Sequence, residues 1–187
     1  MGDTGRTKAE AVADVINGTL YELVLRCIKR PEEPPQPYFA VAVLGYGTDA
    51  AGASRVGSLL RQSESDLWWT PDLASNPLRV DRRPGPGGLI EVLSPVWIEP
   101  GSSGGTPMCS ALDRAGALAH AWVQSYPTAF PPVVINLSDG EATDGDPRVW
   151  ASRLRSLRTD DGGVLLFNLA LSSPAGTTVL FPSSPPR

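Results

Sequence analysis

The feature that most constrains the fold is an apolar run at residues 133–137 that stops at a group of acidic residues and glycines. Four of its five residues are apolar, without the alternation of a half-exposed strand. This pattern is typical of a strand covered on both faces in a mostly parallel sheet. Ligands of such sheets bind beyond the carboxyl ends of the strands. The acidic residues found there are Asp139, Glu141, Asp144 and Asp146.

Hydrophobic periodicity predicts helices on both sides of this strand. Apolar residues recur at spacings of three and four over residues 7–28 and 107–124, and the second helix is expected to have Thr106 as its N-cap. A shorter helix is predicted at 147–157, with Asp146 as its cap and Val149, Trp150, Leu154 and Leu157 facing inward.

Two further apolar runs, at 38–44 and 163–171, predict buried strands. The order strand, helix, strand from residue 132 to residue 171 is that of a crossover between parallel strands. The predicted fold class is therefore α/β, a Rossmann-like three-layer sandwich in which helices cover both faces of a mostly parallel central sheet.

Residues 48–100 are irregular and read as an insertion within one domain. The segment contains a possible edge strand at 54–60, no long helix, and an extended stretch at 89–98 that Pro95 restricts to the edge of a sheet. We expect a single domain over 1–182, including this insertion, and a disordered tail at 183–187.

Composition excludes several classes of partner. The net charge is −4 and no run of Lys or Arg exceeds two residues, so we expect no binding to nucleic acid. No apolar run approaches the roughly 20 residues of a membrane span, and the polar N-terminus lacks the apolar centre of a signal peptide, which indicates a cytoplasmic protein without membrane contact. Cys27 and Cys109 are expected to be reduced packing residues.

Residues 45–50 match the dinucleotide-binding fingerprint with alanine in third place, but their context does not. A nucleotide-binding unit needs a following helix and a second strand ending in an acidic residue, and residues 63–69 do not provide them. Gly45 and Gly47 are therefore interpreted as turn glycines.

Two other motifs fail in a similar way. Residues 101–105 match a hydrolase nucleophile elbow around Ser103, but the only histidine, His120, lies on the helix directly after the loop. Residues 139–150 do not fit a calcium loop, because Asp144 and Trp150 stand where that motif requires glycine and glutamate. Glu141, Asp144 and Asp146 are better explained by a polar turn, whereas Asp139 ends the strand and can face a ligand.

Two segments carry a family resemblance. The Gly-Gly-Thr-Pro-Met sequence at 104–108 precedes a helix, and Val-Val-Ile-Asn-Leu-Ser-Asp-Gly at 133–140 ends a strand. Together they resemble the von Willebrand factor type A domain, particularly its bacterial intracellular members, and the resemblance covers most of the chain. It implies a metal ion-dependent adhesion site, in which Thr106 and Asp139 are the metal ligands.

The chain departs from that family at both ends. The Asp-x-Ser-x-Ser motif of the first strand is missing, and residues 1–8 resemble the short Gly-containing loop that joins this motif to the first helix. The expectation is a domain that lacks this strand and the C-terminal helix. Asp3 and Thr4 cannot replace the motif, because no strand precedes them. Strands left unpaired by its loss would permit self-association.

The resemblance implies a protein-interaction domain and not an enzyme. Its partial adhesion site would hold Mg²⁺ or Mn²⁺ weakly and bind a carboxylate of another protein. Two alternatives stay open: a truncated or degenerate domain that binds no metal, and an α/β enzyme that acts on a nucleotide or phosphate ester through the carboxylates or a Gly-rich turn.

Overall fold

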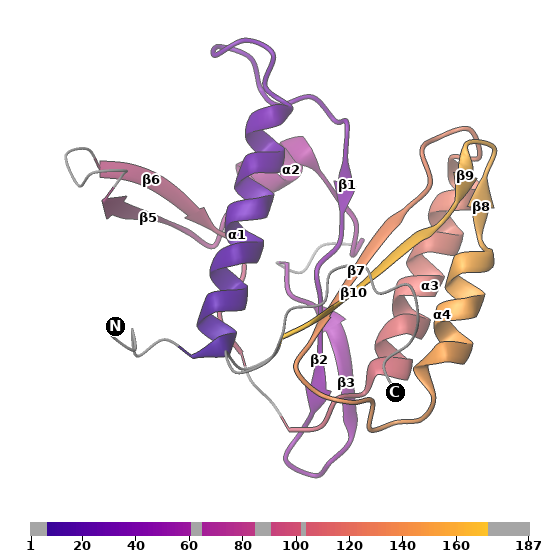
Figure 1. The fold of residues 1–187 in the computed structure, drawn as a ribbon. Coiled ribbons are helices and arrows are strands. Elements are labelled where there is room, and N and C mark those ends of the chain that lie inside the picture. Colours follow the sequence, from indigo (N-terminus) through magenta and orange to yellow (C-terminus); the bar gives the residue numbers. More distant parts are fainter. Residues whose placement is uncertain (1–6, 61–64, 85–90, 102–103, 172–187) are drawn as a thin grey trace.

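The computed structural model describes residues 7–60, 65–84, 91–101 and 104–171 (Figure 1). The helices of this part are α1 (Lys8–Arg26), α2 (Thr70–Ser75), α3 (Met108–Ser125) and α4 (Pro147–Ser156). Its strands are β1 (Ala40–Val41), β2 (Leu44–Thr48), β3 (Ser54–Ser58), β4 (Trp68–Trp69), β5 (Arg79–Pro84), β6 (Glu91–Val96), β7 (Val133–Ser138), β8 (Arg158–Thr159), β9 (Gly162–Gly163) and β10 (Leu165–Ala170).

The expected mixture of helices and strands is confirmed, but the expected continuous sheet is not. Within the described residues the strands pair only two by two: β1 with β4, β2 with β3, β5 with β6 and β8 with β9 antiparallel, and β7 with β10 parallel. A three-layer sandwich around one mostly parallel sheet is therefore not confirmed.

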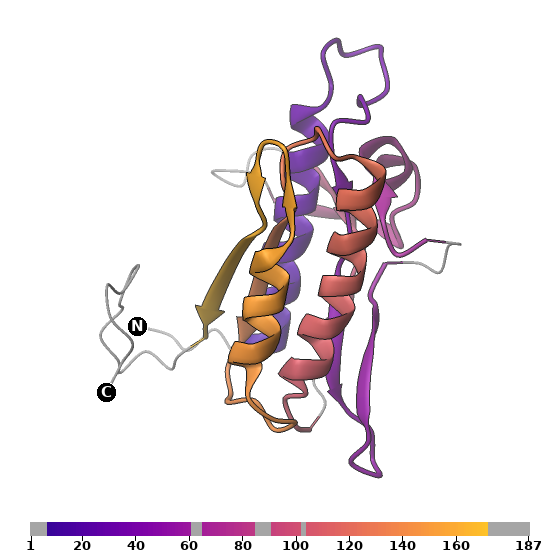
Figure 2. The same ribbon diagram turned by 90° about the vertical axis from the view of Figure 1, so that its right-hand side faces the viewer.

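The predicted crossover from β7 through α4 to β10 is confirmed as a parallel pair. Its register runs from Val133 opposite Leu165 to Ser138 opposite Ala170. Helices α3 and α4 lie side by side and cover one side of this pair (Figures 1 and 2). On the strands, the buried Asn136 donates a hydrogen bond of 2.6 Å to Oδ1 of Asn168.

The prediction that β7 is covered on both faces is wrong. Val133 is 49% exposed and Ile135 is 55% exposed, and the β10 side chains on the same face, Leu165, Phe167 and Leu169, are also exposed. The register places these residues on one face because side chains alternate along a strand. Helices α3 and α4 cover the opposite face, so no described helix covers this apolar surface.

The main core lies beneath α1, apart from that open surface. Ala13, Leu20 and Val24 of α1 pack with buried residues from the irregular middle of the chain, which are Leu60, Trp68, Leu73, Trp97 and Ile98. The Trp97 indole N–H donates to the Leu73 carbonyl at 2.7 Å. The insertion therefore supplies much of the core that supports the first helix.

A buried asparagine fixes α1 to the strand that enters this core. Asn17 is 6% exposed, and its side-chain oxygen accepts from the backbone N–H groups of Trp97 (2.8 Å) and Ile98 (3.1 Å). Its amide donates to the Ile98 carbonyl at 2.9 Å. One side chain thus satisfies three backbone groups that no ladder reaches.

The predicted start of α1 near residue 7 is confirmed, and the structure adds a cap that was not predicted from the sequence. Thr7 is its N-cap and forms a capping box with Glu10. The helix ends before the proline-rich segment at 31–37, whose prolines cannot continue it.

Gly45 and Gly47 lie within β2, so their assignment to a turn is wrong. The strand predicted at 38–44 is replaced by the short β1 and by β2, which runs on to Thr48. A Cβ at Gly45 would come within 2.6 Å of the Leu59 side chain, so a larger residue here would require that exposed side chain to move. The chain reverses later, at Gly52, whose φ of 80° favours glycine.

The predictions for the irregular middle segment are mostly confirmed. The edge strand expected at 54–60 is β3, and α2 is the only helix between residues 48 and 100 in the described part. β6 pairs with β5 alone, with Pro95 opposite Val80, and this hairpin extends away from the rest of the described chain (Figure 1). Pro95 therefore occupies a sheet edge, as expected.

The helix predicted at 147–157 is α4, but one of its side chains points the other way. Leu154 is 1% exposed, whereas Val149, expected to face inward, is 51% exposed. Cys27 and Cys109 are buried and free, as predicted. None of the helices in the described residues is both long enough and apolar enough to cross a membrane.

Replacing Asn17 by alanine should destabilise the fold. The change leaves two N–H groups and one carbonyl buried without partners, each costing about 1–3 kcal/mol, so we expect a loss of about 3 kcal/mol in the free energy of unfolding measured in urea. Gly18→Ala is the matched control. Gly18 is exposed in the same helix with open space around it, and alanine there should add about 1 kcal/mol. If Asn17→Ala lowered the free energy of unfolding by less than about 1 kcal/mol, the role given to the Asn17 side chain would be contradicted.

The open face of β7 and β10 should promote self-association. β7 has no strand partner other than β10 among the described residues, and unpaired apolar strands recruit further chains. We expect sedimentation over a range of concentrations to detect oligomers that Ile135→Lys reduces. Val15→Lys, at an exposed position of α1, should leave the distribution unchanged. A strictly monomeric wild type would contradict this expectation.

Candidate functional site

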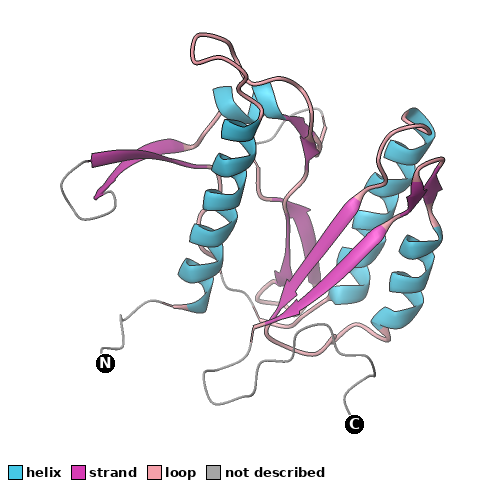
Figure 3. Ribbon diagram, turned by 45° about the horizontal axis from the view of Figure 1, so that its top comes forward, coloured by secondary structure: helices cyan, strands magenta, loops and turns pink. Residues whose placement is uncertain are grey.

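Three loops meet beyond the carboxyl ends of β2 and β7 and before α3. They contain Thr48, residues 138–143 and residues 104–106. β7 and β10 run in parallel toward this end, from which the chain turns back into α4 (Figure 3). The predicted ligand positions Thr106 and Asp139 both belong to these loops.

Threonine hydroxyls hold the loop before α3 in place. The Thr48 hydroxyl accepts from the Gly105 N–H at 2.8 Å, and the Thr143 hydroxyl accepts from the Thr106 N–H at 3.0 Å. The Thr143 N–H donates in turn to the Thr106 carbonyl at 2.9 Å. Sequence reasoning missed Thr48 and Thr143, although each lies at or after the end of a strand, because a lone threonine in a turn carries no specific signal.

Thr106 lies directly against the loop that carries Asp139. A Cβ built on Gly140 would lie 3.0 Å from the Thr106 hydroxyl oxygen, so the two loops approach closely at a glycine. That hydroxyl has no hydrogen-bond partner among the described residues. The structure therefore brings the two predicted residues into adjacent loops and leaves the hydroxyl available.

The Asp139 carboxylate is already paired with a cation. Its side chain is 57% exposed and lies 3.4 Å from the ammonium group of Lys8, in the first turn of α1. An exposed pair of this kind contributes little to stability. Within the described ranges, no three His, Cys, Asp or Glu side chains gather as a metal site would require.

Tyr46 connects β2 to the end of β7. Its hydroxyl lies 2.7 Å from Oδ1 of Asn136 and 3.0 Å from the Leu137 carbonyl, so it can donate to either oxygen. Burial raises the pKa of Tyr46, and the charge of Asp139 raises it further, against the opposing effect of the hydrogen bonds. The hydroxyl therefore stays protonated at neutral pH and acts as a donor.

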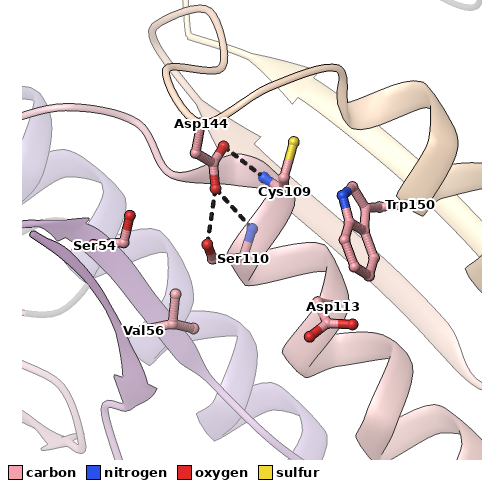
Figure 4. A pocket seen from close by; sticks show the side chains of 7 residues that line it. All are labelled: Ser54, Val56, Cys109, Ser110, Asp113, Asp144 and Trp150. Carbon is pink, nitrogen blue, oxygen red and sulfur yellow. Dashed lines mark hydrogen bonds between the residues drawn. The ribbon is translucent and has the colours of Figure 1, made fainter.

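Thr106 does not cap α3, which corrects the prediction. The N-cap is Pro107, which has no side chain able to accept, and the first turn of the helix is capped by Asp144 instead. The Asp144 carboxylate accepts from the N–H of Cys109 at 2.9 Å, and from the N–H (2.8 Å) and hydroxyl (2.9 Å) of Ser110 (Figure 4). Asp144 is therefore more than part of a polar turn.

This capping shifts the ionisation of two neighbouring groups. Burial alone would raise the pKa of Asp144, but the donors of Ser110 and Cys109 outweigh it and lower that pKa. Burial, helped by the hydrogen bond to Asp144 and its charge, raises the pKa of the Cys109 thiol. Cys109 is thus kept protonated at neutral pH, which does not suit a nucleophile.

A cavity of about 430 Å³ opens beside this cap (Figure 4). It lies between β3, α3 and α4 and is lined by Ser54, Val56, Cys109, Ser110, Asp113, Asp144 and Trp150. Asp113 forms no hydrogen bond or ion pair with another described residue. The lining is polar and acidic but holds no general base other than carboxylates.

The remaining predicted residues have surface or structural positions. Asp146 caps α4 by accepting from the Arg148 N–H at 2.9 Å, as predicted, and hydrogen bonds from Arg148 lower the pKa of Asp146. Glu141 and His120 are exposed. Ser103, Asp3 and Thr4 lie outside the described residues.

Comparison of the chain with models of known protein families, with curated proteins and with solved structures finds no match.

The Asp144 cap should make stability depend on pH. The pKa of Asp144 is lower in the folded state than in the unfolded state, where it is about 3.9. The stabilisation of the fold by this carboxylate is therefore complete above the unfolded-state pKa and is lost as the pH falls through the folded-state pKa. Asp144→Asn should therefore lower the free energy of unfolding by about 1 kcal/mol at pH 7, and by less near pH 3. Urea unfolding at both pH values tests this expectation. Asp113→Asn removes one negative charge from α3 itself without touching the cap, and an equal effect there would contradict the assignment.

Proposed function

We propose that the chain is a protein-interaction module that binds a carboxylate of its partner at the loops carrying Thr106 and Asp139. The observation that carries the proposal is the close approach of the Thr106 hydroxyl to Gly140, which brings that hydroxyl against the loop whose preceding residue, Asp139, has an exposed carboxylate. The described residues of the site contain hydroxyl groups and little charge, and none of them has a side chain suited to nucleophilic attack. Binding is thus favoured over catalysis.

The donor set suits a weakly held divalent ion. Mg²⁺ prefers about six oxygen ligands and gives up its water reluctantly. Thr106 and Asp139 would hold the ion, and water and the partner's carboxylate would complete its shell. The ion would supply positive charge for recognition of that carboxylate.

A metal-free form of the same function is favoured by one specific contact. The Lys8 ammonium lies 3.4 Å from Asp139, so a positive charge already stands at this loop. An ammonium group and a threonine hydroxyl are both donors that a carboxylate accepts. In this form the partner would compete with Asp139 for Lys8.

The proposed module is a relative of the von Willebrand factor type A domain with an interrupted three-layer sandwich. The parallel pairing of β7 with β10, Thr106 ahead of α3, and Asp139 at the end of β7 support this relation. The interruption would lie between β2 and β7, where the Tyr46 side chain makes the polar contacts.

Weak binding of Mg²⁺ or Mn²⁺ should depend on both predicted ligands. Thr106→Ala and Asp139→Ala should each lower the affinity measured by calorimetry about tenfold, since each removes an oxygen ligand. Glu141→Ala, in the same loop, should change it little.

Lys8→Ala separates the two forms of the proposal, because only the metal-free form needs the Lys8 ammonium to bind the partner's carboxylate. It should raise the affinity for metal, because a competing cation is removed from Asp139. If metal binding were tight and insensitive to Asp139→Ala, the site would be misplaced. If a partner's binding survived both EDTA and Asp139→Lys, the adhesion-site mechanism would be wrong.

A further inference from the structure

The cations of the described residues are distributed unevenly between paired and unpaired states. Nine of them form ion pairs with carboxylates: Lys8, Arg26, Arg30, Arg55, Arg79, Arg82, Arg83, Arg114 and Arg148. Lys29 lies over the Tyr38 ring. The others, with no ion pair to any described carboxylate, are Arg153, Arg155 and Arg158, on α4 or just after it.

The segment 147–158 concentrates positive charge in an acidic chain. It contains four arginines and no Asp or Glu, although the whole chain has a net charge of −4. Asp146 precedes the helix and pairs with Arg148 at 2.8 Å, and no other ion pair to the segment is found among the described residues. Charge is not balanced within α4, in contrast to α1, where Arg26 pairs with Glu22.

The outer face of α4 also has a groove. Arg148, Val149, Ser152, Arg153 and Ser156 line a depression of about 530 Å³. These residues lie three and four apart, which places them on neighbouring turns of one face. Val149 adds an exposed apolar side chain to the arginines, and the Arg148 side chain is 89% exposed.

One arginine of this groove is oriented by packing. The Arg153 guanidinium lies 4.8 Å from the centre of the Trp150 ring, within the range of a cation–π contact. Its rotamer freedom is therefore restricted before any partner arrives. Such preorganisation lowers the entropy lost on binding.

We propose that the outer face of α4 is a docking site for an acidic segment of a partner protein. Carboxylates of the segment would pair with Arg148 and Arg153, and an apolar side chain between them would contact Val149. Guanidinium groups bind carboxylates with two parallel hydrogen bonds, which fix the relative orientation of the two groups in addition to the attraction between their charges.

A protein segment fits this face better than a nucleic acid. A nucleic acid presents a long polyanion, of which a basic face confined to one short helix would contact only a small part. The exposed valine offers an apolar contact that phosphates cannot use. A short acidic peptide satisfies both conditions.

This docking site is separate from the loop site around Thr106 and Asp139, and it needs no metal. Binding can therefore be measured in EDTA, where the loop site would hold no ion. Lys8→Ala, which removes the cation of the metal-free form of the loop site, should leave binding at α4 unchanged, so failure of one proposal is distinguishable from failure of the other.

The test uses a fluorescein-labelled decapeptide of glutamate and leucine, titrated with the full chain at low salt and followed by anisotropy. Arg153→Glu should weaken binding at least about tenfold and Arg153→Gln by less, because the first reverses a contacting charge and the second only removes it. Asp146→Asn should strengthen binding about twofold, since it releases Arg148 while asparagine still caps the helix.

Arg26→Glu is the matched control, with the same change of charge at an exposed position in the last turn of α1. It should alter the affinity less than about twofold, and circular dichroism should show all variants folded. Equal weakening by Arg26→Glu and Arg153→Glu, or no binding of the peptide by the wild type, would overturn the proposal. A labelled DNA decamer that bound more tightly than the peptide, with the same dependence on Arg153, would overturn it in favour of nucleic acid.

Discussion

The hydrogen bonds between the first turn of α3 and Asp144 determine the arrangement of the whole loop end of the structure. A proline at the N-cap cannot satisfy the free N–H groups of the helix, so a carboxylate from a loop far along the chain does so. This links the start of α3 to the segment after β7. Together with the hydrogen bonds between Thr106 and Thr143, it holds the loop of Thr106 close to Gly140, the residue after Asp139.

The rest of the described fold depends on polar contacts of the same kind, each made by one side chain. Asn17 joins α1 to the strand before α3, and Tyr46 joins β2 to β7. These bonds stand where a continuous sheet would have used backbone ladders. Specificity in this chain is thus carried by a few buried polar groups, which are costly to leave unpaired.

The sequence was informative where local rules decide the outcome. The helix α1, the Asp146 cap of α4, the parallel crossover and the edge position of Pro95 follow from periodicity and turn chemistry. It was misleading where tertiary packing decides. Gly45 lies within a strand close to the Leu59 side chain, and Val133 belongs to a face that no described element covers. The Asp144 cap joins residues 34 and 35 apart, a distance over which local patterns give no signal.

The one-sided pairing of β7 has a consequence for its backbone amides. The carbonyls of Pro132 and Ser138 accept from β10 and the residue after it, and a parallel ladder uses alternate residues of each strand. The N–H groups of Val134, Asn136 and Ser138 therefore point toward β10, and those of Val133, Ile135 and Leu137 point away from it. Protection against hydrogen exchange should alternate along this single strand. A second chain that pairs with the outer edge of β7 would also protect the N–H groups that point away from β10. The residues that gain protection would show where that chain lies along the strand.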